Sequence, residues 1–215
     1  MSLIFDSEGF PDFFAQAPIL HIQDKLAWFL GAADAGLLQY RYADAVKLAG
    51  HSCPTVAAAY LMTLAGIKAL YGEELAQRGE IEVFFAQSPD SGTTGVMASI
   101  VQLLTGAASD TGFAGIGAQA LFKRRNLLQF NADIDAVMLM RRQDNGDAVS
   151  IALNTEIVPW PEEMRALMPK EMSGLAAAHE QSRFARLWQE RVSQMLLHHA
   201  EDSQMIQLKQ CVFPS

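Results

Sequence analysis

The sequence predicts an α+β fold in which helices pack on a mixed or antiparallel sheet. An apolar run with helical periodicity covers residues 54–71, and alternating segments rich in β-forming residues come after it. The dipeptide Asn145-Gly146 between two apolar runs is the strongest short-range signal for a β-hairpin. Because a hairpin pairs antiparallel strands, a doubly wound parallel sheet is the less favoured arrangement.

Length and composition predict a single domain over residues 1–215. The chain has 215 residues, 50% of them hydrophobic, which is enough apolar surface for a sizeable core. No linker rich in Pro, Gly or Ser divides it. We expect the core at about 20–160 and C-terminal helices at about 161–200.

The first half of the chain carries three helix signals. Residues 24–30 have apolar periodicity, with Asp24 suited to the N-cap. A second helix over residues 42–49 stops at Gly50. The third begins at Pro54, whose missing N–H is no loss in a first turn, and continues to about residue 71. The segment between the second and third helices is therefore a turn.

The second half alternates strands with helices. Residues 80–85 and 127–130 read as strands, and residues 97–104 as a helix closed by a glycine. Residues 136–142 and 147–154 form the predicted hairpin, whose Asn-Gly turn can take two positive φ angles. The last two helices are predicted from residue 161 to about 168 and over residues 180–197.

Charge and composition exclude several functions. The net charge of −8 disfavours nucleic acid, whose phosphates attract clustered Lys and Arg. The most apolar stretch is interrupted by Lys68 and falls short of the roughly 20 residues that a bilayer needs. The first fourteen residues carry three acidic residues and no basic one, unlike a secretory signal. Two cysteines suit a reducing compartment, so we expect a soluble, cytoplasmic protein.

The residues most suited to chemistry are His51 and Cys53. If Pro54 is the first helical residue, Cys53 is the N-cap, where free N–H groups and the helix dipole favour a thiolate. His51 lies in the same turn, near enough to share a metal ion or accept the thiol proton. On spacing alone, a buried structural cysteine beside a surface histidine is the more common outcome.

Three other histidines are weaker candidates. His198 and His199 are adjacent on a helix, so their side chains point about 100° apart and cannot readily share a metal. His21 has no partner at a useful spacing. The sequence contains no dinucleotide fingerprint, phosphate-binding loop, nucleophile elbow or HExxH motif.

Two motifs resemble a known family. The segment Ala49-Gly50-His51-Ser52-Cys53-Pro54 leads into an alanine-rich helix, and a Gln-x-Leu-Thr-Gly ending follows at residues 102–106. Together they resemble the FmdE-like family, which takes its name from formylmethanofuran dehydrogenase, over about residues 42–128. The resemblance implies an FmdE-like α+β core, frequent homodimers, and a divalent metal, often zinc, near His51 and Cys53. It implies no settled reaction.

The chain also departs from the family pattern. The Cys and Asp that typical members carry before the second motif would fall near Val96 and Ser99, and neither replaces a thiolate. Asp90 offers an oxygen ligand instead, although a turn-capping role suits it as well. The zinc ribbon that some relatives append is absent, because Cys211 is the only later cysteine.

Three hypotheses follow for the function. In the first, His51 and Cys53 bind a divalent metal, with Asp90, water or a small-molecule ligand completing an open site. In the second, Cys53 is a metal-free nucleophile and His51 its base. In the third, the protein is an accessory or binding module without catalytic activity. The sequence does not decide whether the protein is an enzyme.

Overall fold

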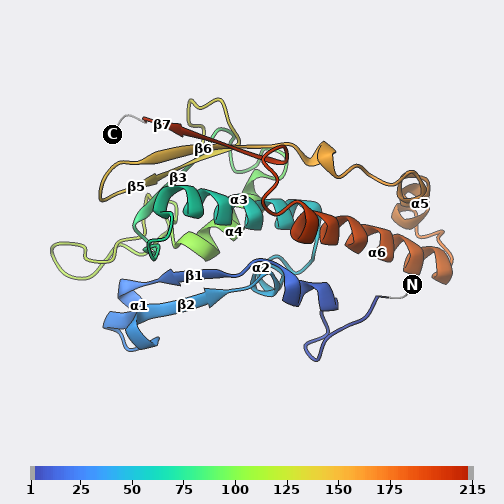
Figure 1. Ribbon diagram of the computed structural model, residues 1–215, viewed down its shortest axis with the longest axis horizontal. Coiled ribbons are helices and arrows are strands. Elements are labelled where there is room, and N and C mark those ends of the chain that lie inside the picture. The colour runs from blue at the N-terminus through green and yellow to red at the C-terminus, as the bar shows by residue number, and fades with distance from the viewer. Residues whose placement is uncertain (1–2, 213–215) are drawn as a thin grey trace.

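The computed structural model describes residues 3–212 and arranges them in three layers (Figure 1). Helices α3 and α4 form the middle layer, below a five-stranded sheet and above a two-stranded one. Helices α5 and α6 extend beyond one end of α3. The elements are η1 (Asp12–Gln16), β1 (Leu20–Gln23), α1 (Lys25–Phe29), η2 (Asp34–Gly36), β2 (Leu37–Tyr40), α2 (Tyr42–Ala49), α3 (Pro54–Tyr71), β3 (Ile81–Phe85), α4 (Thr94–Thr105), β4 (Leu128–Gln129), β5 (Met138–Arg142), β6 (Ala148–Leu153), η3 (Thr155–Ile157), α5 (Glu162–Met172), α6 (Ala178–Ser193), η4 (Gln194–His198) and β7 (Ile206–Cys211).

The predicted α+β class with a mixed sheet is confirmed. The larger sheet has the strand order β4-β3-β5-β6-β7, in which β3 and β4 are parallel and the other neighbours antiparallel. Strands β1 and β2 pair with each other in an antiparallel ladder. Residues 1–2 and 213–215 of the predicted single domain lie outside the described residues, and the domain prediction itself stays untested.

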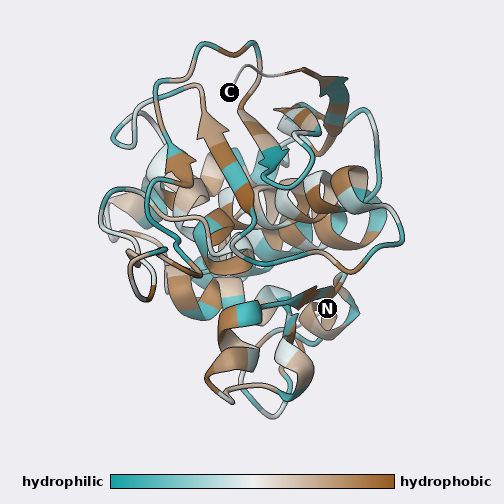
Figure 2. Ribbon diagram, turned by 90° about the vertical axis from the view of Figure 1, so that its left-hand side faces the viewer, coloured by the Kyte–Doolittle hydropathy of each residue, from teal (hydrophilic) through white to brown (hydrophobic). Residues whose placement is uncertain are grey.

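Helix α3 lies at the centre of the core. The layers above and below it bury most of its surface, and Lys68 is its one exposed residue. Figure 2 shows the apolar residues concentrated in this middle layer. A Cβ on Gly66 would stand 2.5 Å from the sulfur of Met140 and 2.6 Å from Cδ1 of Ile151. The absence of a side chain at this position therefore lets α3 pack closely on the sheet.

The predicted hairpin is present, but its turn differs from the predicted one. Strands β5 and β6 pair as expected. Gly146 takes a positive φ of 80°, whereas Asn145 does not. Arg142 N–H bonds to the carbonyl of Asp147 at 2.9 Å, which closes a four-residue loop instead of a two-residue one. The Arg142 guanidinium also binds both carboxylate oxygens of Asp144, at 2.9 and 2.6 Å, which stabilises the longer loop.

Several other boundaries differ from the predictions. Helix α4 begins three residues before the predicted 97, and α5 continues past the predicted 168 and through Pro169. Helix α6 ends at Ser193 and passes into a π-helical turn. Strands β2 and β7 were not predicted. Within residues 3–212, no helix combines the length and the apolar character needed to cross a bilayer.

A buried carboxylate joins the lower layer to the rest of the fold. Asp24 is 3% exposed and caps α1, accepting hydrogen bonds from the N–H groups of Leu26 and Ala27. Its Oδ2 accepts from Arg78 at 2.8 Å and its Oδ1 from Arg124 at 2.7 Å. The two arginines come from segments 54 and 100 residues further along the chain. One carboxylate therefore ties three distant segments together.

The surroundings of Asp24 leave no room for other side chains. A Cβ on Gly79, where φ is +82°, would stand 0.7 Å from Nη1 of Arg124. Burial raises the pKa of Asp24, but the hydrogen bond from Arg78 and the charge of Arg124 outweigh burial, so the pKa lies below its usual range. Asp24 is thus ionised in the folded protein at neutral pH.

We expect Asp24→Asn to lower the free energy of unfolding by about 3–5 kcal/mol, because it leaves two largely buried arginines without their counter-charge while an asparagine can still cap α1. Urea denaturation at pH 7 measures the change. Lys25→Ala is the control, since its salt bridge to Glu80 is exposed and should contribute at most about 1 kcal/mol.

The difference between wild type and Asp24→Asn should also depend on pH. A carboxyl whose pKa is lower in the folded state stabilises above its unfolded pKa, roughly 3.9, and loses that contribution as pH falls through the folded value. The free energies of unfolding of wild type and Asp24→Asn, plotted against pH, should therefore converge below about pH 4. A difference that stays constant from pH 7 to pH 2 would contradict the assigned ion pairs.

Candidate functional site

The candidate site is the turn between α2 and α3. Helix α2 ends at Gly50, which has a left-handed φ of 74°, and its N–H bonds to the carbonyl of Val46. Helix α3 begins at Pro54 with Cys53 as its N-cap, as predicted. A strong stop signal and a strong start signal therefore leave three residues, His51, Ser52 and Cys53, to form the turn.

Cys53 takes the role that Ser, Thr, Asp or Asn usually has at a helix start. Its sulfur accepts a hydrogen bond from the N–H of Val56 at 3.4 Å, which satisfies one of the free donors of the first turn. The residue is 8% exposed and packs in the main core cluster. The sulfur is thus held at the N-terminus of α3, close to the protein surface.

His51 is exposed, and its ring orientation is fixed by one contact. Its Nδ1 lies 2.9 Å from the carbonyl oxygen of Ala49. A carbonyl only accepts, so this contact requires the proton on Nδ1 and leaves the lone pair on Nε2. Histidines that bind metals commonly donate the other ring N–H to a carbonyl in this way. Nε2 is therefore the atom able to bind a metal or accept a proton.

Asp90 lies in the turn before α4, where it makes a local contact. Its Oδ1 accepts a hydrogen bond from the Ser88 hydroxyl at 2.5 Å, and this bond holds the pKa of Asp90 below its usual range. Among residues 3–212, no three or more His, Cys, Asp or Glu residues are grouped so as to hold a metal ion. His51, Cys53 and Asp90 consequently do not form such a group, and metal sharing by His51 and Cys53 stays a prediction.

Val96 and Ser99, the two residues near which the family resemblance implied a Cys and an Asp, lie on α4. Val96 is 38% exposed, and the Ser99 hydroxyl donates to the carbonyl of Gly95 at 2.9 Å. A hydroxyl that bonds to its own helix is occupied in a local contact. Neither residue supplies the missing thiolate.

Three residues that the sequence did not single out hold the turn in place. Trp188 and Gln189 of α6 donate hydrogen bonds to the carbonyl of Ser52, and the Ser52 hydroxyl donates to the side chain of Gln189. Tyr42 of α2 bonds to the same hydroxyl at 3.0 Å. The apolar face of α6 includes Trp188, but no local signal marked Gln189 or Tyr42 as polar partners.

The three weaker histidine candidates lie elsewhere. His199 Nδ1 is 2.7 Å from the carboxylate of Asp202, and this hydrogen bond lowers the pKa of Asp202. His198 is exposed beside it, in the π-helical turn. His21 is exposed on β1.

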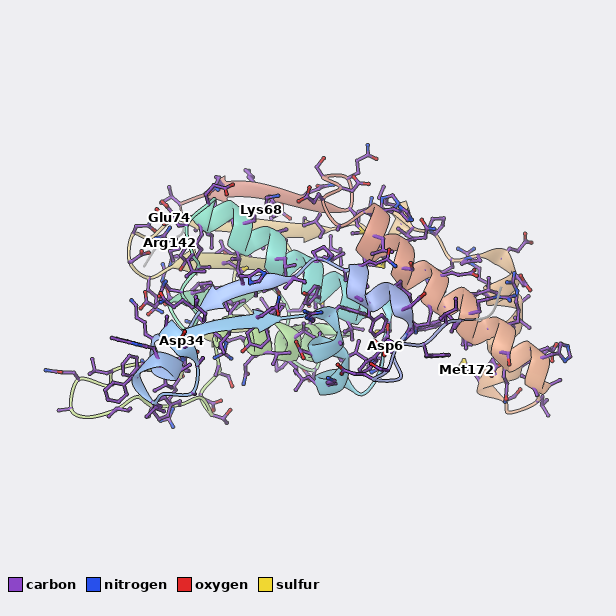
Figure 3. The ribbon with its side chains drawn as sticks, turned by 60° about the horizontal axis from the view of Figure 1, so that its bottom comes forward. Asp6, Asp34, Lys68, Glu74, Arg142 and Met172 are labelled. Carbon is purple, nitrogen blue, oxygen red and sulfur yellow. The ribbon has the colours of Figure 1, made fainter. Side chains whose placement is uncertain are left out.

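A groove of about 1020 Å³ lies along α3 but does not include the candidate turn. It runs between β1 and β7, and its lining is mainly apolar, including Ile19, Leu61, Leu64, Ile206 and Leu208. Lys68 and Glu201 form a salt bridge at its rim. In Figure 3, Lys68 lies near Glu74 and Arg142 at the C-terminal end of α3, whereas the turn lies at the other end of this helix.

Fold and turn together define an α+β protein with a thiol and an imidazole in one turn between helices. Residues 48–204 match a family model described as "FmdE, Molybdenum formylmethanofuran dehydrogenase operon". The match covers most of the chain and includes the turn, so the protein belongs to the FmdE family. No curated protein matches the chain.

We expect a thiol reagent at neutral pH to label Cys211 before Cys53. Cys211 ends the edge strand β7 and is partly exposed, whereas Cys53 is 8% exposed. Mass spectrometry of partly labelled protein gives both rates, and labelling in denaturant should make them similar. If Cys53 reacted first despite its burial, its sulfur would be activated, as the metal-free thiol hypothesis requires.

Proposed function

We propose that the protein is a metal-binding member of the FmdE family in which His51 and Cys53 hold a divalent metal, with zinc the metal that suits them best. The main support is the contact between His51 Nδ1 and the carbonyl of Ala49, which leaves Nε2 free in the same turn as a thiol. Imidazole nitrogen and thiolate sulfur are preferred ligands of zinc.

The donor chemistry fits zinc, and the number of donors points to an open site. Structural zinc has four protein ligands and catalytic zinc usually three, but the described residues offer two in this turn. Water or a small-molecule ligand would complete the coordination, so binding should be looser than in a closed site. A zinc ion in an open site can polarise a carbonyl or acidify a water molecule.

Two alternative functions are each favoured by a different observation. The hydrogen bond from Val56 N–H to the Cys53 sulfur favours a metal-free thiol enzyme, with His51 Nε2 as the base. The lack of ligands at Val96 and Ser99 favours an accessory or binding module.

We further propose that the protein is a cytoplasmic homodimer. Dimers are what the family resemblance implies, and its cysteines, Cys53 and Cys211, are both free, as a reducing compartment favours.

Zinc titration of purified protein tests the metal hypothesis. Cys53→Ser should lose most of the bound zinc because it removes the thiolate, and His51→Ala should lose a substantial share. Asp90→Asn should have a smaller effect, since Asp90 is engaged with Ser88. Affinity should rise with pH, because the metal displaces the thiol proton.

Circular dichroism is the folding control for all three variants, and His198→Ala is the matched control for the loss of an exposed histidine. If Cys53→Ser kept wild-type affinity while His198→Ala abolished binding, the metal site would lie at the other end of the chain. Absence of zinc binding by the wild type would leave the thiol and accessory hypotheses.

A further inference from the structure

We propose that Trp188 and Gln189 are positioning residues that hold the His51–Cys53 turn in one conformation, so that helix α6 controls the geometry of the site. The proposal rests on the proposed function only in treating this turn as the functional one. Its structural basis is the set of contacts around Ser52, the residue between the imidazole and the thiol.

Ser52 is bonded through both its carbonyl and its hydroxyl. Its carbonyl oxygen accepts from Trp188 Nε1 at 3.0 Å and from Gln189 Nε2 at 3.2 Å. Its hydroxyl donates to Gln189 Oε1 at 3.0 Å. Because that proton is used, the 3.0 Å contact with Tyr42 has the tyrosine as donor, and burial raises the pKa of Tyr42, which keeps it protonated. The Gln189 amide therefore binds Ser52 twice, accepting a hydrogen bond through Oε1 and donating one through Nε2.

These bonds fix the direction of the neighbouring side chains. The Ser52 carbonyl lies in the rigid peptide plane that also contains the nitrogen and Cα of Cys53. Two donors on that oxygen therefore set the orientation of the plane, and with it the position of the Cys53 sulfur at the start of α3. Cys53 has a φ of −148° and a ψ of 167°, in the extended region to which the ring of Pro54 restricts the preceding residue, and the contacts on Ser52 select the orientation within that region.

A second set of contacts fixes Trp188 itself. Its ring packs edge-on against Trp160, with centroids 5.3 Å apart, and at a tilt against Phe184, with centroids 5.6 Å apart. Arg191 lies 4.3 Å over the ring of Trp160 and donates to the carbonyl of Val158 at 2.7 Å.

These contacts give the buried Arg191 a role. It is 4% exposed, burial lowers its pKa, and it forms no salt bridge within residues 3–212. A buried cation without a carboxylate costs free energy unless it is well bonded. Here it binds carbonyl oxygens and an aromatic face, and so holds Trp160 against Trp188. The turn, α6 and the segment before α5 therefore act as one unit.

Thiol labelling in metal-free buffer tests the proposal. Cys53 is buried, so its labelling rate follows the equilibrium for local opening of the turn. Trp188→Phe keeps the ring and removes the N–H, while Gln189→Leu removes both amide contacts. Loss of a hydrogen bond should raise the Cys53 rate about fivefold, and the double variant should raise it further.

Cys211 in the same molecule is the internal control. It lies on β7, away from the turn, so an effect confined to the turn leaves its rate unchanged. Because Cys211 is already partly exposed, urea denaturation of each variant measures general destabilisation. Trp28→Phe and Gln181→Leu are matched control variants, because both residues are exposed and neither bonds to the turn. Both control variants should label like the wild type.

Equal acceleration of labelling at both thiols, or no acceleration at Cys53 in either α6 variant, would overturn the proposal.

The variant Gln189→Glu adds a second check. Its carboxylate can still accept from the Ser52 hydroxyl but cannot donate to the Ser52 carbonyl, so its Cys53 labelling rate should lie between those of the wild type and Gln189→Leu. The outcome is separate from the zinc titration, since no metal is present. A wild type that fails to bind zinc leaves this test intact.

Discussion

The ion pairs of Asp24 are the constraint on which the arrangement of the layers depends. Arg78 also donates to the carbonyl of Leu103 at the end of α4, and Arg124 donates to the carbonyl of Arg78. Without the carboxylate, two cations would be packed against each other in a largely buried space. With it, the β1–β2 layer, the entry to β3 and the loop before β4 meet at one point, which lets α3 lie enclosed between two sheets.

Local sequence signals predicted the elements whose ends are marked by special residues. Pro54 and Gly50 defined the start of α3 and the end of α2, and both boundaries are as predicted. Strand β7 was missed because an edge strand exposes most of its side chains, which leaves a weak apolar pattern. The hairpin loop differed because the side chain of Arg142 reaches Asp144, a contact that turn propensities do not include.

For the candidate site, too, the sequence predicted the features that depend on neighbouring residues and not those that depend on distant contacts. The N-cap position of Cys53 follows from five consecutive residues, 50–54, whereas the hydrogen bonds that hold Ser52 depend on partners 136 and 137 residues away. No local sequence pattern predicts that a glutamine on a helix bonds to a distant turn. That contact depends on which face of the helix packs against the turn. The same holds for Asp24: the sequence predicted its role as a helix N-cap, but not its ion pairs with Arg78 and Arg124.

The separation between Ser52 and Trp188 also matters during synthesis. At roughly 5–20 residues per second, a ribosome needs on the order of 7–30 s to make the 136 residues that separate them. Throughout that interval the nascent chain has the thiol of Cys53 but not the helix that holds its turn. The finished geometry therefore arises only after α6 has been made, and any metal loading that requires this geometry comes after that point.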